Sequence, residues 1–458
     1  MSDKRQNNQL MLAFDQEYRG EASKGLSEGT ETLAAKRGTE SPAINEQLME
    51  EVCERENCKQ ALKQVKANKG SPGVDGMTVQ QLPEYLKQHW LAIREQLQSG
   101  TYKPKPVKRV EIPKPDGGVR KLGIPTVLDR FIQQAVMQVL QRKWDGTFSE
   151  HSYGFRPGRS AHQAVEKAQQ YIAEGYRWVV DLDLEKFFDR VNHDKLMSKI
   201  AGRISDKRML KLIRAFLTAG VMENGLVSST EEGTPQGGPL SPLLSNIMLD
   251  DLDRELEQRG TRFVRYADDS NIYVRSQRAG ERVMASITRF LTERLKLTVN
   301  QSKSAVARPW VRKFLGFSFT GGKEPKRRIA PKAIDRFKER VRELTSRTRG
   351  VSIKRMAEDL TQYLRGWLGY FGKCQTPSVL EGLEGWIRRR LRSVIWRQWK
   401  RGSVRFAELR KRDVKHDLAA KTAGSSKGPW RLADSLGLHK ALPNAYFDSL
   451  GLPRLTVQ

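Results

Sequence analysis

The sequence predicts an α+β fold, with short strands in its first two thirds and helices in its last third. Residues 262–265 and 271–274 alternate apolar and polar side chains around a turn, which is typical of a β-hairpin. Residues 178–183 form another strand-like run that passes directly into a helical segment at 184–189. Beyond residue 331, apolar side chains recur at helical spacing, which predicts helices.

The turn of the expected hairpin carries the sequence Tyr266-Ala267-Asp268-Asp269. Two adjacent carboxylates repel one another, which is a poor arrangement for stability alone. The pair suits Mg²⁺, a hard cation that takes carboxylate oxygens and keeps open positions for phosphates. Aspartate also favours turns for conformational reasons. The hairpin by itself therefore leaves open both a solvated turn and a metal site.

A third carboxylate favours the metal site. Asp183 lies at the carboxyl end of the 178–183 run, so the turn into the next helix would place it beside the hairpin. Three aspartates on two sheet segments form a platform for nucleotidyl transfer, where one ion activates a primer 3′-hydroxyl and the other neutralises the triphosphate. Asp181 shares a strand face with Asp183 and is a rival. We rank Asp181 lower because it sits about two residues further from the strand end.

The composition indicates a polyanionic partner. The chain has a formal net charge of +29 and a pI near 10.1, which is typical of proteins that bind nucleic acid. A membrane surface is the competing explanation, but no apolar run approaches the roughly 20 residues needed to span a bilayer. The first residues also lack the apolar core of a signal peptide. Three cysteines, Cys53, Cys58 and Cys374, cannot form a disulfide framework, which indicates a reducing compartment.

Further motifs carry a family resemblance. Residues 112–125 contain a Pro-Asp-Gly-Gly turn, residues 233–242 contain Pro-Gln-Gly-Gly, and residues 363–371 resemble the maturase "domain X" signature. Together with the aspartate segments, they form an ordered series that resembles the reverse transcriptase/maturase encoded by bacterial group II introns. The remaining blocks that match this family lie at residues 152–160, 297–303 and 313–317.

The resemblance implies a right-hand polymerase, whose fingers and palm contain an antiparallel sheet and whose thumb is helical. We expect residues 1–45 to be largely disordered, because they are polar and rich in Gly, Glu, Ser and Thr. Fingers and palm would occupy 46–320, and glycines at 321–322 followed by Pro325 predict a boundary. The thumb with domain X would occupy 325–379, and a small, helical, basic nucleic-acid-binding region would occupy 380–458.

The resemblance also implies the roles of individual residues at the polymerase site. Catalysis is expected from Asp183, Asp268 and Asp269. These three residues and Leu184 would hold two Mg²⁺ ions, for which Mn²⁺ could substitute. The family also places Lys303 near the palm, among the residues that bind the nucleotide.

Four more residues are expected to bind the incoming dNTP. Lys114 and Arg120 flank the Pro-Asp-Gly-Gly turn, from which both cations would project toward the triphosphate. Gln236 lies in a glycine-rich turn that lets the backbone approach a ligand closely. Phe188 is expected to stack under the sugar and exclude a 2′-hydroxyl. A place in the core is the open alternative for Phe187 or Phe188.

Basic helices predict a nucleic-acid surface. A helix beginning at Pro331 has apolar residues at 334, 337, 341 and 344 and almost only positive charge on its remaining face, although a solvated charged face is the alternative. From residue 380 onward, arginines and tryptophans surround an apolar stripe, a mixture that contacts phosphates and stacks on bases. The expected nucleic-acid contacts are Tyr266, Arg336, Arg340, Arg388, Arg389, Arg390 and Arg392.

These features predict an RNA-directed DNA polymerase that also binds group II intron RNA to assist splicing and retrohoming. Its partners would be the intron RNA, target DNA with a primer, and dNTPs, and not a membrane, while the oligomeric state is left open. We expect a bacterial, cytoplasmic protein that associates with the nucleoid when bound to DNA. No cysteine follows Cys374 and the histidines His416 and His439 stand alone, so we expect no HNH endonuclease domain. Two alternatives remain: a reverse transcriptase of a phage-defence or CRISPR-associated system without an intron, and a maturase that only assists splicing.

Overall fold

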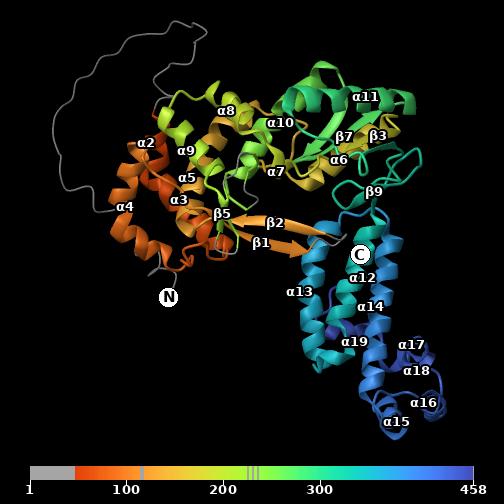
Figure 1. The fold of residues 1–458 in the computed structure, drawn as a ribbon. Helices are drawn as coiled ribbons and strands as arrows, with labels where there is room; N and C mark the ends of the chain where they lie inside the picture. The colour runs from red at the N-terminus through yellow and green to blue at the C-terminus, as the bar shows by residue number, and fades with distance from the viewer. Residues whose placement is uncertain (1–46, 114–117, 224–225, 229–231, 235–236, 457–458) are drawn as a thin grey trace, which may run out of the picture. The chain divides into compact units, whose positions relative to one another are not determined.

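The computed structural model describes residues 47–456, apart from 114–117, 224–225, 229–231 and 235–236 (Figure 1). The segment 1–45, which the sequence predicts to be disordered, lies outside the described residues. The chain divides into two compact units according to its internal contacts. The first unit comprises the residues up to 168 together with 178–306, and the second comprises 169–177 together with the residues from 307 onward.

Helices of the first unit enclose one large apolar core. Helix α5 begins at a capping threonine, Thr126, whose hydroxyl accepts a hydrogen bond from the backbone N–H of Asp129. Helix α10 has Pro242 in its first turn, where a missing N–H is tolerated. The helices that lie in or begin in this unit are α2 (Leu48–Cys53), α3 (Arg55–Asn68), α4 (Leu82–Gln98), α5 (Val127–Trp144), η2 (Asp145–Thr147), α6 (Ala161–Ala173), α7 (Phe187–Arg190), α8 (His193–Ala201), α9 (Lys207–Leu217), α10 (Ser241–Gln258), α11 (Gln277–Phe290) and η3 (Leu291–Leu295).

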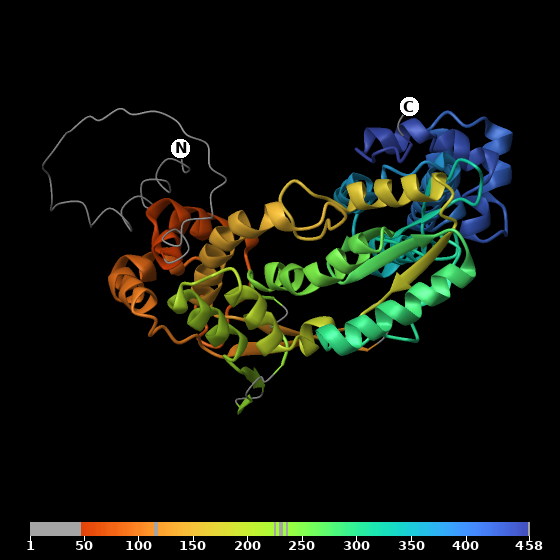
Figure 2. The same cartoon turned by 90° about the horizontal axis from the view of Figure 1, so that it is seen from above.

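One four-stranded sheet of this unit has the order β6-β7-β3-β8. Strand β7 (Asp269–Val274) pairs in the antiparallel sense with both β6 (Arg262–Tyr266) and β3 (Trp178–Leu182), and β8 (Ala305–Ala307) forms an edge. Helix α11 packs on β3 and β7, and Figure 2 shows it running along the sheet. The predicted hairpin around residues 267–268 is confirmed as β6 and β7.

The other four-stranded sheet has the order β2-β1-β4-β5. Strand β1 (Val107–Pro113) is antiparallel to β2 (Val119–Ile124), which confirms the hairpin predicted for this segment. On its other side, β1 is parallel to β4 (Val221–Glu223), which is antiparallel to the edge strand β5 (Leu226–Ser228).

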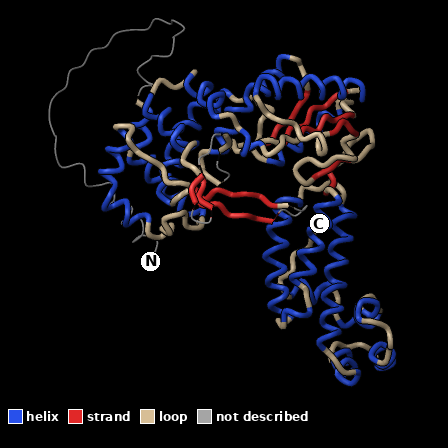
Figure 3. The backbone as a smooth tube through the Cα atoms, viewed as in Figure 1, coloured by secondary structure: helices blue, strands red, loops and turns tan. Residues whose placement is uncertain are grey.

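The second unit is mainly helical (Figure 3). The helix predicted to begin at Pro331 is α12 (Pro331–Leu344), which buries Phe337 and Val341 in a second apolar core. Within the described ranges, no helix of either unit is both long and apolar enough to cross a membrane. The remaining elements are β9 (Phe317–Phe319), β10 (Arg327–Ile329), η4 (Arg347–Arg349), α13 (Ile353–Phe371), α14 (Pro377–Gln398), α15 (Gly402–Arg410), α16 (His416–Ala423), α17 (Pro429–Leu432), α18 (Leu436–Ala441) and α19 (Asn444–Ser449).

Candidate active site

The strand pairing brings the expected carboxylates to one end of the β6-β7-β3-β8 sheet. The last paired residue of β3, Leu182, lies opposite Ser270 of β7, so Asp183 follows at the end of β3 beside the β6–β7 turn. That turn is closed by the pair of Tyr266 and Asp269, which leaves Asp268 at its tip. Two carboxylates that are 85 residues apart in the sequence, those of Asp183 and Asp268, therefore lie close together in space.

The electrostatics of Asp268 reflect this proximity. Burial raises the pKa of the half-buried Asp268 carboxyl, and the nearby Asp183 carboxylate raises it further. A hydrogen bond from its own backbone and the positive charges of Arg120 and Arg265 oppose that rise in pKa only in part. Two like charges held together in this way favour a cation between them.

The backbone of Asp183 is fixed by the segment that follows η3. The N–H of Asp183 donates to Oγ of Ser304 at 3.0 Å, and its carbonyl accepts from the N–H of Asn300 at 2.8 Å. The neighbouring Leu184 has a buried side chain and forms an isolated bridge with Val299. These contacts explain how residue 183 keeps its place although the regular pairing of β3 has already ended.

Lys303, which the family resemblance places among the nucleotide-binding residues, lies beside Asp183. Its Nζ is 4.0 Å from Oδ1 of Asp183. Asp181, the rival carboxylate, lies within β3 opposite Asn271. In the orientation that satisfies its neighbours, the Asn271 amide donates to Oδ1 of Asp181 at 3.0 Å. Asp181 thus has an internal partner, which supports ranking it below Asp183.

The residues present suit a magnesium site that substrate completes. Asp269 is exposed at the start of β7. In the parts of the chain that the structure describes, no group of three or more His, Cys, Asp or Glu is arranged to hold a metal ion by itself. Mg²⁺ commonly binds one or two carboxylates together with waters and substrate phosphates, so the close pair of Asp183 and Asp268 fits its chemistry.

The structure describes some of the expected nucleotide-binding residues but not all of them. Arg120 lies in β2, and its charge acts on Asp268. Lys114 and Gln236 lie outside the described residues. Next to Gln236, Gly237 has a φ of +132°, and a Cβ built on it would lie 2.7 Å from the carbonyl oxygen of Gly123 in β2. A glycine is therefore required where this turn meets the hairpin of Arg120.

Phe187 and Phe188, for which the sequence left a core position open, have different environments. Phe187 is buried in the core, whereas Phe188 is half-buried and packs against the core from outside it. The carbonyl of Phe188 accepts a hydrogen bond from the N–H of Thr234 at 2.6 Å. A ring nitrogen of the buried His193 lies 2.5 Å from the carbonyl oxygen of Gly233, which holds the same segment in place. Phe188 is therefore the less buried of the two, and its backbone is tied to the segment at residues 233–234.

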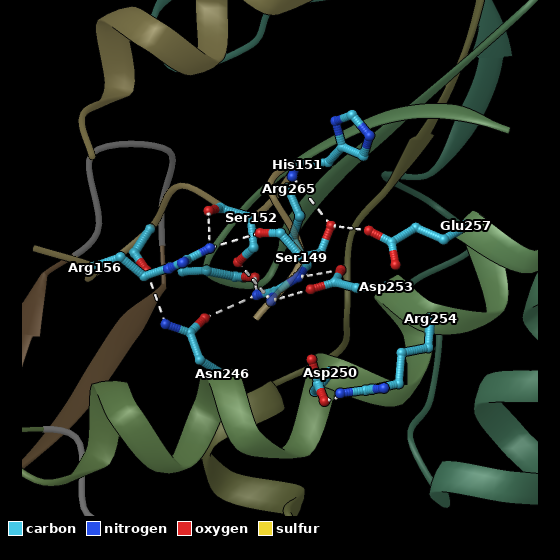
Figure 4. A network of polar contacts seen from close by, with 12 residues as sticks. Ser149, His151, Ser152, Arg156, Asn246, Asp250, Asp253, Arg254, Glu257 and Arg265 are labelled. Atoms are coloured by element: carbon cyan, nitrogen blue, oxygen red, sulfur yellow. Dashed lines mark hydrogen bonds and ion pairs between the residues drawn. The ribbon is translucent and has the colours of Figure 1, made fainter. Parts of the chain in front are cut away.

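A buried polar network lies behind the β6–β7 turn, and none of the sequence motifs assigned a role to it (Figure 4). At its centre is Arg265, whose side chain is 0% exposed and paired with the equally buried Asp253 of α10. Asn246, also on α10, bonds both to Arg265 and to the carbonyl of Gly154. The signal that could have predicted this network is Arg265 itself, a charged residue that follows the apolar Phe263 and Val264 within β6 and directly precedes Tyr266.

In the second unit, the structure corrects two of the expected nucleic-acid contacts. Arg388 is 6% exposed and forms ion pairs with Glu384 and Asp448, and Arg392 is 3% exposed and donates from Nε to the carbonyl of Leu442 at 2.9 Å. Guanidinium groups committed to internal partners in this way hold the helices together and are not presented to RNA.

The other expected contacts are more accessible. Arg389 lies over the ring of Trp430, 4.5 Å from its centroid, and Arg390 donates to Oγ1 of Thr345 at 2.8 Å. On α12, Arg336 and Arg340 are exposed. In the first unit, Tyr266 is half-buried, with its ring centroid 6.4 Å from that of Phe155.

Comparison with known proteins adds two domain assignments. Residues 112–319 match the family "Reverse transcriptase (RNA-dependent DNA polymerase)", and residues 334–412 match "Group II intron, maturase-specific domain". Protein YkfC of Escherichia coli (strain K12) is 38% identical over 240 residues, which cover 51% of this chain and 63% of YkfC. Group II intron-encoded protein LtrA of Lactococcus lactis subsp. cremoris is 42% identical over 174 residues, which cover 38% of this chain and 29% of LtrA. The matches thus span less than two thirds of either relative.

A solved structure offers only a weak likeness. A chain of the "Partial Cas6-RT-Cas1--Cas2 complex" is 24% identical to this chain. The match covers 54% of this chain and 42% of that chain, with a TM-score of 0.35. The match to a reverse transcriptase domain is thus followed, after a short gap, by the match to a maturase-specific domain. The chain is therefore similar to the reverse transcriptase/maturase proteins encoded by group II introns, and its mixture of helices and antiparallel strands fits the predicted α+β right-hand polymerase fold.

Proposed function

We propose that this chain is an RNA-directed DNA polymerase that also binds a group II intron RNA and assists its splicing and mobility. Its substrates are an RNA template, a DNA or RNA primer and dNTPs. The observation that supports the polymerase most directly is the pair of Asp183 and Asp268, which two neighbouring strands hold close together against their mutual repulsion. Such a pair destabilises the protein unless a cation binds it.

The proposed mechanism assigns a task to each part of the site. Asp183 and Asp268, with the exposed Asp269 beside them, would hold two Mg²⁺ ions, which would supply activation of the primer hydroxyl and neutralisation of the triphosphate. Arg120 provides a cation from the β1–β2 hairpin that offsets phosphate charge close to Asp268. The half-buried Phe188 lies beside the Gly233 segment, and its ring limits the room for a 2′-hydroxyl.

Primer extension with matched carboxylate variants tests this assignment. Asp183→Asn and Asp268→Asn should each lower the rate of extension on an RNA template by about 1000-fold or more, because each loses an anionic ligand. Asp194→Asn is the control, since Asp194 is an 83% exposed surface carboxylate of the same unit that pairs with Arg214. Extension within threefold of wild type in either site variant would refute the assignment.

The maturase part of the proposal rests on the maturase-specific match and on the exposed cations of α12, among them Arg336 and Arg340. A ribozyme supplies its own catalytic centre, so a protein that assists it needs an RNA-binding surface and not the aspartates. The double variant Asp268→Asn/Asp269→Asn should therefore still promote splicing of the intron RNA at moderate salt. Loss of splicing together with retained RNA binding would contradict this division of tasks.

A further inference from the structure

We propose that Arg265 is a positioning residue for the candidate metal site, which acts by holding the backbone carbonyl of Ala267 and thereby orienting Asp268. The inference rests on the proposed polymerase function and concerns the same site. It assigns a task to the side chains that contact Arg265 in Figure 4 and to the block at residues 152–160, which resembles the family but has no role in the chemistry proposed above.

All five N–H groups of the Arg265 guanidinium are used. Nε and Nη2 donate to the two oxygens of Asp253 at 2.7 and 2.5 Å, which is the bidentate geometry that fixes a guanidinium in its plane. The remaining three N–H groups donate to Oδ1 of Asn246 at 3.0 Å, to the carbonyl oxygen of Ala267 at 2.9 Å and to Oγ of Ser152 at 2.7 Å. A lysine could carry the same charge but could not reach these acceptors from one plane.

The bond to Ala267 falls on a strained part of the turn. Ala267 has a φ of +56°, in the left-handed region that favours glycine, and it is followed directly by Asp268. A non-glycine residue persists there only when its surroundings impose the conformation. The hydrogen bond from Arg265 is one such constraint, and the close approach of Gly154 is another, because a Cβ on Gly154 would lie 2.3 Å from the N atom of Ala267.

The block that begins at Ser152 holds Arg265 from the other side. The N–H of Arg265 donates to the carbonyl of His151 and the N–H of Tyr153 donates to the carbonyl of Arg265, both at 2.9 Å, so this segment runs beside β6 like a short parallel strand. Nη1 of Arg156 in turn donates to the carbonyls of Ser149 at 2.6 Å and of Ser152 at 3.0 Å. The block is therefore a scaffold for the turn, and the turn carries the carboxylate.

A buried ion pair is weak evidence for stability by itself, because desolvation of both charges opposes their attraction. Arg265 and Asp253 are both 0% exposed, so this opposition applies fully. The pair has a geometric consequence that an apolar pair lacks, since only a donor can hold the carbonyl of Ala267. We therefore expect the network to determine metal affinity and rate beyond its effect on folding.

The test compares Arg265→Lys and the double variant Arg265→Met/Asp253→Leu with Arg254→Lys. The double variant removes the buried charges together, so it can fold while it lacks the bond to Ala267. The control residue Arg254 also lies on α10 and pairs with Asp250 at 2.8 Å. Binding of Mn²⁺, followed by electron paramagnetic resonance of the protein–primer–template complex, gives a readout that does not depend on turnover. Thermal unfolding is measured in parallel.

In variants that stay folded, Mn²⁺ affinity should fall about 10-fold or more, and kcat for extension should fall by about 100-fold, as for other residues that orient metal ligands. The control should change both by less than twofold. If neither site variant folds, Asn246→Ala, which keeps the ion pair, should show the same two effects at smaller size. Unchanged Mn²⁺ affinity in any folded site variant would overturn the inference. In that case the proposed function would still stand if the wild-type protein binds Mn²⁺ and extends the primer. If wild type itself neither binds Mn²⁺ nor extends a primer, the proposed function fails instead.

Discussion

A single methyl group at Gly154 should impair catalysis by displacing the turn that carries Asp268. A Cβ on this residue would lie 2.3 Å from the N atom of Ala267 and 2.9 Å from the carbonyl carbon of Tyr266, whereas ordinary contact begins at 3.4 Å. Both neighbours are backbone atoms of the turn, so no side chain can rotate away. Either the turn or the Gly154 segment must therefore move by about 1.1 Å.

The size of this displacement sets the expected effect. A shift of about 1 Å in a reacting group costs about 100-fold in rate, so Gly154→Ala should lower kcat for primer extension by about that factor. Overpacking of this kind also costs about 1–3 kcal/mol of the free energy of unfolding, which leaves most molecules folded at 25 °C if the unit has ordinary stability. The loss in kcat should therefore exceed any loss of folded protein.

Single-nucleotide extension under saturating dNTP, with urea unfolding of the same preparations, measures both quantities. Gly146→Ala is a matched control, because Gly146 lies eight residues away and a Cβ on it would meet nothing within 4 Å. We expect the control to keep wild-type kcat within twofold. If Gly154→Ala is folded and equally active, the position of the turn at the 1 Å level does not limit the chemistry, and the reasoning is wrong.

Three other predictions follow from particular side chains. Phe188→Ala should raise kcat/KM for ribonucleotides relative to deoxyribonucleotides by about 10-fold or more, and an unchanged ratio would return Phe188 to a packing role. Since the pKa of Asp268 is raised in the fold above its usual 3.8, its ionisation opposes folding at neutral pH. Asp268→Asn should therefore raise the melting temperature at pH 7, and this gain should vanish as the pH falls below 3.8; a gain that is independent of pH would refute this cause. Arg388→Ala should cost about 3–5 kcal/mol of unfolding free energy, whereas Arg336→Ala/Arg340→Ala should leave stability unchanged and lower the log–log salt slope of RNA binding by about one unit per lost phosphate contact.

The parts of the fold that could be predicted from the sequence are those whose signals are local. Alternating side chains around a turn predict β6 and β7, and a proline before a periodic apolar run predicts α12. The position of Asp183 could be predicted for the same reason, because it directly follows a strand. Each of these features depends on residues within about one element of each other.

The burial of charged residues could not be predicted in this way. Three consecutive arginines at 388–390 must point in different directions around α14, since successive residues of a helix are about 100° apart. Arg388 and Arg392 are four residues apart, so they lie on the same face of α14. This face is next to the one that carries the buried Ile387 and Leu391. Their partners, Asp448 and the carbonyl of Leu442, lie 60 and 50 residues further along the chain, so no local sequence pattern predicts these contacts.

The same distinction applies to the candidate active site. The carboxylates of Asp183 and Asp268 repel one another, so a site built from them needs a scaffold that resists their separation. That scaffold comes from segments that are remote in sequence: residues 298–304 hold Asp183, and residues 149–156 together with α10 hold the turn before Asp268. Substitutions in these segments should therefore weaken metal binding at positions that never touch a metal ion, and a search limited to carboxylates would miss them.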